Sequence, residues 1–137
     1  MKTAGVLESC VYAKDLEAAE QFYKDVIGLE VISREEGRHV FFRCADSVVL
    51  IFNSERASTE QTWVRGAPIP MHGSLGAGHL AFRISMDDLP VWREHLKRCG
   101  VEIESEVCWE NGVQSIYIRD PAGNSVELAP PLLWGLE

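Results

Sequence analysis

The sequence contains one pattern twice, and the second copy begins about 72 residues after the first. Residues 8–16 and 79–89 each start with a run typical of a β-strand and end in an Asp-Leu pair that can open a helix. Gly28 and Gly100 stand at matching positions, where a glycine in the left-handed conformation would end that helix. The repeat therefore predicts two similar modules that together fill most of the chain.

Each copy has the element order β-α-β-β-β. After Asp15 and again after Asp88, apolar side chains recur at helical spacing, which indicates one helix with a single apolar face in each copy. Alternating or β-branched runs indicate strands near residues 7–13, 29–34, 38–44 and 47–53, and then near 77–84, 101–107, 113–119 and 124–128. The expected fold class is therefore α+β.

We expect a single domain over residues 1–137. Its parts are module one at about 5–54, a linker at about 55–75, module two at about 76–130 and a C-terminal tail at 131–137. The linker is rich in glycine and proline and is long for a connection, so we interpret it as either mobile or functional. The tail is apolar and is expected to dock on its own subunit or on a partner.

Composition excludes several classes of function. The net charge of −8 disfavours binding to nucleic acids or to anionic membrane surfaces. No apolar run approaches the roughly 18 residues of a membrane span, and the N-terminus lacks the apolar stretch of a secretory signal. The four cysteines form no C-x-x-C pair, so we expect reduced thiols, mostly small core residues, in a cytoplasmic protein.

One face of the predicted strands is unusually polar. Alternation places His39 and Arg43 on one face of a strand in the first module, and Tyr117 and Arg119 on one face of the matching strand in the second. A sheet with one buried face would simply expose these side chains to water. Alternation alone therefore leaves two interpretations open, a solvated face or the wall of a site.

The repeat favours a site. Glu8 and His79 occupy equivalent positions, and the match of SVVL at residues 47–50 to SVEL at residues 125–128 pairs Val49 with Glu127. Glutamate and histidine are common metal ligands, and a carboxylate in the middle of a strand is costly to bury without a partner. A divalent cation would remove that cost.

Three segments carry a resemblance to a known family. They are KDLEAAEQFYKDVIGL at 14–29, GHLAF at 78–82 and YIRDPAGNSVEL at 117–128. With them, the chain resembles the vicinal oxygen chelate superfamily of glyoxalases, bleomycin-resistance proteins and extradiol dioxygenases. The resemblance implies two β-α-β-β-β modules that form a cupped mixed sheet around a metal site. It also implies that the inner positions of the first and fourth strands, here Glu8, Val49, His79 and Glu127, face the metal.

The chain departs from the family pattern in its ligand set. Valine cannot ligate, so three metal ligands are expected, namely Glu8, His79 and Glu127. A set with a single histidine does not match the two-histidine, one-carboxylate triad of Fe(II) dioxygenases, and it suits Mn²⁺, Ni²⁺, Zn²⁺ or Mg²⁺ better than iron. The resemblance further implies a homodimer.

The function implied by the resemblance is that of a glyoxalase-like lyase or isomerase, which chelates two neighbouring oxygens of a small-molecule substrate. Glu127 or Glu8 would move the proton. The expected substrate contacts are His39, Arg43, His72, Tyr117 and Arg119, with His72 in the linker as a candidate lid residue. The alternatives are a ring-cleaving dioxygenase, an antibiotic-inactivating addition enzyme and a non-catalytic drug-binding protein of the bleomycin-resistance type. The identity of the substrate is left open, because specificity depends on loops and on a few inner side chains.

Overall fold

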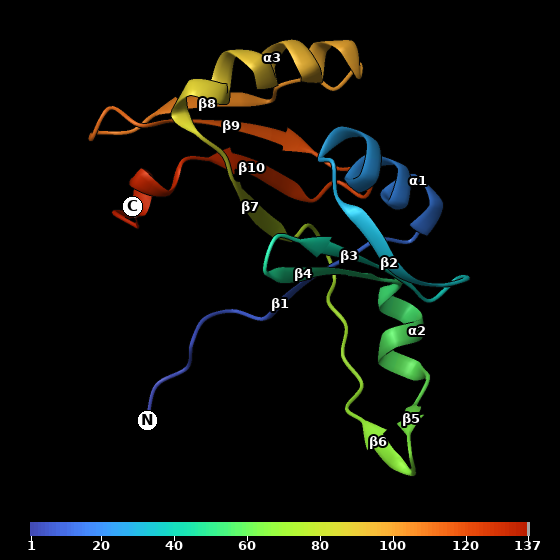
Figure 1. Cartoon of the computed structure of the whole chain (residues 1–137). Helices are drawn as coiled ribbons and strands as arrows, with labels where there is room; N and C mark the ends of the chain where they lie inside the picture. Colours follow the sequence, from blue (N-terminus) through green and yellow to red (C-terminus); the bar gives the residue numbers. More distant parts are fainter. Residues whose placement is uncertain (137) are drawn as a thin grey trace. The chain divides into compact units, whose positions relative to one another are not determined.

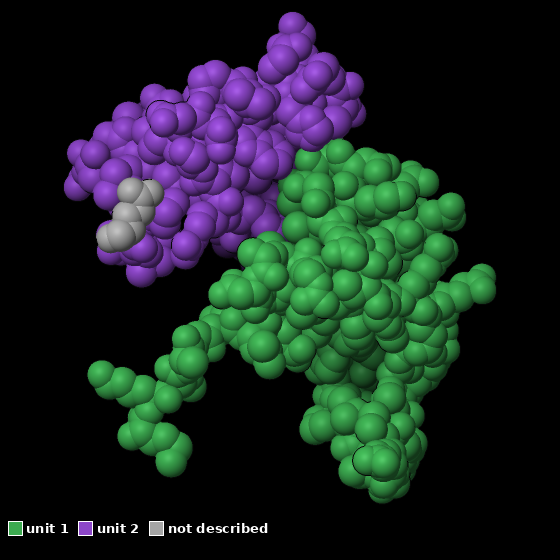
Figure 2. Space-filling model, viewed as in Figure 1, with its two compact units in different colours: residues 1–76 green, residues 77–137 purple. Residues whose placement is uncertain are grey.

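The computed structural model describes residues 1–136, which form two compact units, residues 1–76 and residues 77–136 (Figure 2). Each unit contains one β-α-β-β-β module, as the repeat predicts, and the α+β fold class is confirmed. The last residue of the predicted tail, at position 137, lies outside the described residues. No helix within residues 1–136 is both long and apolar enough to cross a membrane.

The first unit is built on a four-stranded mixed sheet (Figure 1). The order is β1-β4-β3-β2, with β1 parallel to β4 and the other neighbours antiparallel. The strands are β1 (Glu8–Tyr12), β2 (Glu30–Glu35), β3 (His39–Cys44) and β4 (Ser47–Phe52). All four lie within one or two residues of the predicted bounds, because each strand has an alternating or β-branched apolar run that ends near a turn.

The helix of the first unit packs against one face of this sheet. The carboxylate of Asp15 accepts a hydrogen bond from the Ala18 backbone at 3.0 Å and so caps α1 (Leu16–Gln21), which continues as a π-helical turn η1 (Phe22–Val26). Tyr23 is fully buried, and its ring centroid lies 5.7 Å from that of Phe42 on β3. This face of the sheet therefore forms the core, and the opposite face is left for a site.

The segment predicted as a linker has regular structure of its own. It contains α2 (Ser54–Thr59) and a hairpin of β5 (Thr62–Val64) and β6 (Ala67–Ile69). The side chain of Asn53 caps α2 by accepting from the Arg56 backbone at 3.2 Å. Arg65 and Gly66 both have positive φ, at 50° and 84°, which suits the two-residue turn of a tight hairpin.

The second unit repeats the sheet of the first, with the order β7-β10-β9-β8. Its elements are β7 (His79–Arg83), η2 (Met86–Asp88), α3 (Leu89–Arg98), β8 (Ser105–Cys108), β9 (Gln114–Arg119), β10 (Ser125–Ala129) and η3 (Pro131–Trp134). The helix starts differently from the prediction. Ser85 caps a 3₁₀ turn that precedes α3, by accepting from the Asp87 backbone at 3.3 Å, whereas Asp88 makes no side-chain cap.

The register of the sheets corrects the predicted match between Val49 and Glu127. Glu8 lies opposite Val48 on β4, whereas His79 lies opposite Ser125 on β10. The position equivalent to Ser125 is therefore Val48. Two residues further along, the equivalent of Glu127 is Leu50.

The prediction that Val49 lines the site is wrong. Val49 is 4% exposed and lies opposite Phe42, on the face of the sheet that packs in the core. Aligning the two SV dipeptides shifts the strand by one residue, and a shift of one residue moves every side chain to the other face. The two sequences do match at these positions, but the match pairs residues that differ by one position in the sheet register.

The cysteine prediction holds only in part. All four cysteines are free, as expected, but none belongs to the core. Cys10, Cys99 and Cys108 are exposed, and Cys44 is half-buried. The expectation that these small side chains would lie in the core is therefore wrong.

Candidate functional site

The first unit forms a partly open cavity of about 720 Å³ on the face of its sheet opposite α1. Alternate residues of three strands supply the floor, and they are Glu8, Cys10 and Tyr12 from β1, His39 and Phe41 from β3, and Val48, Leu50 and Phe52 from β4. The segment after β6 adds Pro70, Met71 and His72. The polar face recognised in the sequence is thus the wall of a cavity in this unit.

Aromatic rings form a continuous surface in this cavity. The rings of His39 and Phe41 stack with centroids 4.0 Å apart and planes 13° apart. Phe52 meets Phe41 at 5.1 Å and His72 at 4.6 Å, in both cases edge to face. Tyr12 extends the surface to β1, with its ring 5.9 Å from that of His72. A flat apolar group would find several ring partners here.

His72 is held against the cavity by three sets of contacts. Its Nδ1 lies 2.7 Å from the Tyr12 hydroxyl, and its backbone nitrogen donates to the Ala57 carbonyl at 3.1 Å. Nearby, the Ser54 hydroxyl donates to the Ser74 carbonyl at 2.7 Å and accepts from the Ser74 backbone at 3.0 Å. The structure therefore places the predicted substrate contact His72 at the cavity.

The charges around this cavity are largely paired. Arg38 contacts the Glu60 carboxylate at 3.5 Å, donates to the Glu60 backbone carbonyl at 3.4 Å, bonds the Thr62 hydroxyl and lies 3.9 Å from Glu35. Glu60 also accepts from Arg56 at 2.8 Å. The guanidinium of Arg38, whose side chain is 12% exposed, is therefore already surrounded by acceptors.

Three titratable groups of the cavity are held in their uncharged forms. Burial raises the pKa of Tyr12 to about 12 and also raises the pKa of the Cys10 thiol. Burial lowers the pKa of His39, an effect that Glu35 opposes and Arg38 reinforces. Near neutral pH these groups act as uncharged hydrogen-bonding partners.

In the second unit, His79 and Glu127 come together from neighbouring strands. Nε2 of His79 lies 3.5 Å from Oε2 of Glu127, although 47 residues separate them in the chain. Nδ1 of the same ring lies 3.2 Å from the Ser125 hydroxyl. Glu127 is only 5% exposed, and its Oε1 has no hydrogen-bond partner in the described part of the chain. A buried carboxylate with an unsatisfied oxygen is a strained arrangement that a cation would relieve.

Tyr117 completes this group from β9. It lies opposite Glu127 in the sheet register, and its ring stacks on His79 with a centroid distance of 6.3 Å and an interplanar angle of 24°. Burial raises the pKa of the Tyr117 hydroxyl, and the neighbouring Glu127 carboxylate raises it further. Tyr117 is therefore a neutral donor beside a carboxylate.

A buried turn fixes the position of His79. Oδ1 of Asp120 accepts from the backbone of Ala122 at 2.9 Å and of Asn124 at 2.8 Å. Asn124 in turn accepts from the Gly78 backbone at 2.7 Å through its Oδ1. Because this bond joins the start of β7 to the start of β10, His79 is aligned with Ser125 and with the strand that carries Glu127.

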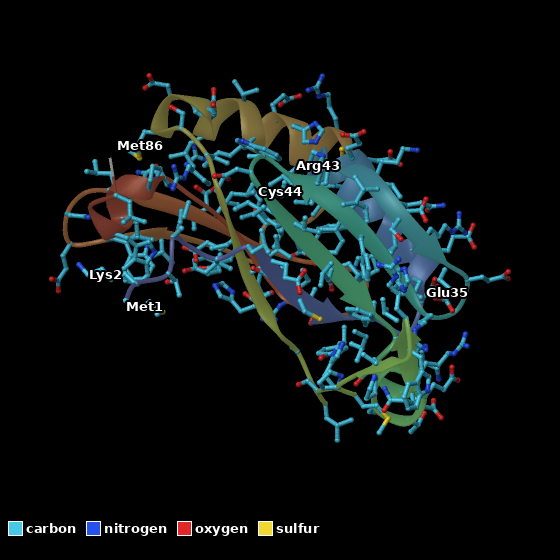
Figure 3. The ribbon with its side chains drawn as sticks, turned by 60° about the horizontal axis from the view of Figure 1, so that its bottom comes forward. Met1, Lys2, Glu35, Arg43, Cys44 and Met86 are labelled. Atoms are coloured by element: carbon cyan, nitrogen blue, oxygen red, sulfur yellow. The ribbon has the colours of Figure 1, made fainter. Side chains whose placement is uncertain are left out.

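Neither predicted substrate arginine lines the cavity of unit 1, and Arg119 lies opposite Ser125 in the second sheet, on the face that carries Glu127. Arg119 forms an ion pair with Glu104 and donates to the Gly123 carbonyl at 3.1 Å. Arg43 shares a sheet face with His39 but is exposed at the other end of β3, away from the Glu35 end (Figure 3), and it does not line the cavity.

Within each unit, no cluster of three or more metal-ligating side chains occurs among residues 1–136.

Sequence reasoning missed several residues of the cavity. Leu50 and Phe52 were missed because the repeat was aligned one residue out of register on β4. Alternation from Val48 onward would have found both. Arg38 lies in a turn, and only its tertiary contacts reveal its position, so no local signal marks it.

Comparison with known proteins gives the chain its family. The model of the Glyoxalase/Bleomycin resistance protein/Dioxygenase superfamily matches residues 5–128. The chain belongs to this superfamily. Its repeat, its paired sheets and its element order are those that the sequence resemblance led us to expect.

Three similar proteins have names that point to different activities. The chain is 39% identical to the lactoylglutathione lyase of Agrobacterium tumefaciens, with a TM-score of 0.91, and the match covers 99% of this chain and 100% of that one. It is 28% identical over 128 residues to the metallothiol transferase FosB of Bacillus licheniformis, covering 93% of this chain and 75% of FosB. It shares the fold of the fosfomycin resistance protein FosX of Listeria monocytogenes, solved with Mn(II) and 1S,2S-dihydroxypropylphosphonic acid, at 23% identity and a TM-score of 0.68, covering 93% and 90% of the two chains.

Proposed function

We propose that this protein is a divalent-metal-dependent enzyme of the glyoxalase type, a lyase or isomerase that acts on a small substrate with two neighbouring oxygens. Glu8, His79 and Glu127 are the proposed metal ligands. The observation that carries the proposal is the buried carboxylate of Glu127, which has one oxygen 3.5 Å from His79 and the other without a hydrogen-bond partner among residues 1–136.

The donor set fits a divalent cation. Carboxylate oxygen and imidazole nitrogen are the ligands that Mn²⁺, Ni²⁺ and Zn²⁺ accept, and the oxygen-rich character extends to Mg²⁺. Ser125 is placed to hold the His79 ring through Nδ1, which leaves Nε2 directed toward Glu127. Glu8 has its carboxylate on the cavity face of β1 and would be the third ligand.

The chemistry follows from these residues. A bound divalent cation would supply Lewis-acid stabilisation to a carbonyl or enediolate oxygen. Glu127, with a buried and incompletely bonded carboxylate, is suited to accept a proton from carbon and return it. Tyr117 stays protonated beside Glu127, because its raised pKa favours the neutral phenol, and it can donate a hydrogen bond to the substrate.

The named relatives support the proposal. One is called a lactoylglutathione lyase and another a metallothiol transferase, so two relatives in the same superfamily carry names that imply a lyase activity and a metal-linked activity. The second name points to thiol addition, one of the two rivals within catalysis. The other rival is ring-cleaving dioxygenation.

Metal titration tests the proposal. The purified protein, stripped of metal with a chelator, should bind about one Mn²⁺ per chain by calorimetry and gain thermal stability on binding. His79→Ala should lose this binding, whereas His95→Ala on α3, outside the proposed site, should keep it. Binding that survives His79→Ala would overturn the ligand assignment. A protein that binds vicinal-oxygen compounds but no divalent metal would instead be a drug-binding protein.

We also propose a homodimer. Trp63, Val64 and Ile69 on the β5–β6 hairpin are exposed, and several exposed apolar side chains on one hairpin favour an interface. Sedimentation equilibrium should give twice the mass of the 15.3 kDa chain, and Trp63→Glu should shift the equilibrium toward the monomer. A monomer at all concentrations would refute this part of the proposal.

A further inference from the structure

The cavity of unit 1 combines a wall of aromatic rings with charges that are already paired. From this combination we propose that the substrate carries an uncharged aromatic ring, which packs on Phe41 and Phe52, and that the cavity disfavours anionic substrates. The inference rests on the proposed function, because it names the substrate class of the same site. It separates this protein from relatives whose names point to glutathione or phosphonate compounds, both of which are anionic.

The two phenylalanines are turned toward the cavity. Phe41 and Phe52 are half-exposed and line it, whereas Phe42, the next residue after Phe41 on β3, is fully buried in the core. Their rings meet at 5.1 Å, and the stacked pair of His39 and Phe41 continues the surface. Rings left open to a cavity gain most from another ring, since offset and edge-to-face contacts add to simple apolar burial.

The dimensions fit a ring together with a vicinal-oxygen group. A volume of about 720 Å³ lies within the range of small-molecule sites, roughly 300–1,000 Å³. In the sheet register, Glu8 pairs with Val48, and Leu50 lies between Cys10 and Phe41. Phe41 therefore lies two residues along the strands from the level of Glu8, or about 7 Å. A phenyl ring that carries a two-carbon diol spans such a distance.

The charges of the cavity disfavour an anion. Apart from histidines, Arg38 is the one basic side chain among the described lining residues, and Glu60, Glu35 and Thr62 already surround its guanidinium. Three carboxylates line the cavity, those of Glu8, Glu35 and Glu60. In the metal-free protein, an anionic ligand would therefore find no unpaired arginine or lysine among the described lining residues and would face the carboxylate of Glu8.

The polar groups of the cavity suit an uncharged ligand. Tyr12 and His39 are both shifted toward their neutral forms, so they offer hydrogen bonds without charge. The Tyr12 hydroxyl and the His72 imidazole lie 2.7 Å apart at the edge of the ring wall. They can orient a hydroxyl or carbonyl of the ligand while its ring lies on Phe52.

A matched set of three compounds tests the inference on the metal-free protein. The compounds are 1-phenyl-1,2-ethanediol, which has the ring and no charge, 1,2-propanediol, which lacks the ring, and mandelate, which has the ring and a carboxylate. Affinities are measured by ¹H–¹⁵N NMR titration. We expect the phenyl diol to bind at least about tenfold more tightly than propanediol and more tightly than mandelate, with shifts centred on Phe41 and Phe52.

Variants separate the contribution of the rings from that of the charges. Phe41→Leu and Phe52→Leu keep the apolar volume but remove a ring, so each should weaken the phenyl diol about threefold to tenfold and leave propanediol unchanged. Trp92→Leu, on α3 and outside the cavity, is the matched control and should change neither affinity. Glu60→Gln frees Arg38 and should improve the binding of mandelate relative to the diol.

The outcomes distinguish this inference from the proposed function. Equal binding of the two diols, or tighter binding of mandelate by the unmodified protein, would overturn the inference whether or not metal binds. A clear preference for the phenyl diol in a protein that binds no divalent metal would support the inference and refute the enzyme proposal. Chemical-shift changes that map outside the cavity would overturn the assignment of Phe41 and Phe52 as the binding surface for the ring.

Discussion

Nε2 of His79 lies 3.5 Å from Oε2 of Glu127, and the other oxygen of this buried carboxylate has no hydrogen-bond partner within residues 1–136. The sheet register creates this proximity. His79 lies opposite Ser125, and Glu127 follows two residues later on the same face of β10. The pair therefore lowers the stability of the metal-free protein, and its two side chains are already positioned to bind a cation.

The cost can be measured by removing the carboxylate. Glu127→Leu should raise the free energy of unfolding of the metal-free protein by roughly 1–3 kcal/mol, because it removes a buried group with an unsatisfied oxygen. The same variant should show no stabilisation by Mn²⁺. Urea denaturation with and without metal measures both effects, and Glu127→Gln, which keeps the shape, is the control. A leucine variant less stable than the metal-free parent would show that the carboxylate is well satisfied in solution.

Ser125 should act on the metal site without touching the metal. Its hydroxyl lies 3.2 Å from Nδ1 of His79, a contact that holds the ring and its tautomer. Ser125→Ala should weaken Mn²⁺ binding about 10–100-fold while the fold is retained. The ¹⁵N shifts of the His79 ring should change their tautomer signature, which a purely structural role would leave intact. Ser115→Ala, at a buried serine on β9, provides the comparison.

The corrected register can be tested on β4. Leu50, the equivalent of Glu127, lines the cavity on the face that carries Glu8, so Leu50→Glu should be tolerated at a cost of about 1–2 kcal/mol. It should also bind divalent metal more tightly by adding a carboxylate. Val49→Glu places the same charge in the core and should cost about 3–5 kcal/mol. Equal destabilisation by the two variants would show that the strand does not keep this register in solution.

The raised pKa of Tyr12 predicts a pH dependence. The folded state holds this pKa at about 12, above the usual value of 10. The stability contributed by the neutral phenol is therefore fully present below pH 10 and is lost as the pH rises from 10 to about 12. Tyr12→Phe should show a smaller loss of stability over this window than the parent protein. Guanidinium midpoints at pH 9 and pH 11.5 measure the difference, and identical losses would contradict the assignment.

Gly73 should control how firmly the segment with His72 is held. A Cβ at this position would lie 2.9 Å from the Ser58 Cβ and 3.1 Å from the Ser54 carbonyl oxygen. Gly73→Ala should therefore push the segment away from α2, at a cost of roughly 1–3 kcal/mol. Amide hydrogen exchange should rise at His72 and Ser74, whose backbone nitrogens donate to Ala57 and Ser54. Unchanged protection at both amides would show that the segment has room to adjust.

The sequence predicted the architecture because the necessary signals are local. Strand alternation, the cap at Asp15 and the repeat are properties of short segments, and the structure confirms the β-α-β-β-β order in both units. The structure also brings His79 and Glu127 together as expected. The place of Glu8 in one ligand set with them remains a prediction, to be tested by metal titration.

The sequence by itself determined the modules, the polar faces of their strands and the residue types that can bind a metal. Only the tertiary structure decided which residue of β4 shares a face with Glu8. A sequence alignment can be shifted by one residue and still match well, but in a sheet this shift moves every side chain to the opposite face. Tertiary structure also decided that Arg38 is neutralised by Glu60 and Thr62, and that His72 meets Tyr12. These contacts join residues 22 to 60 positions apart, and such pairs leave no periodic trace in the sequence because they depend on packing across the sheet.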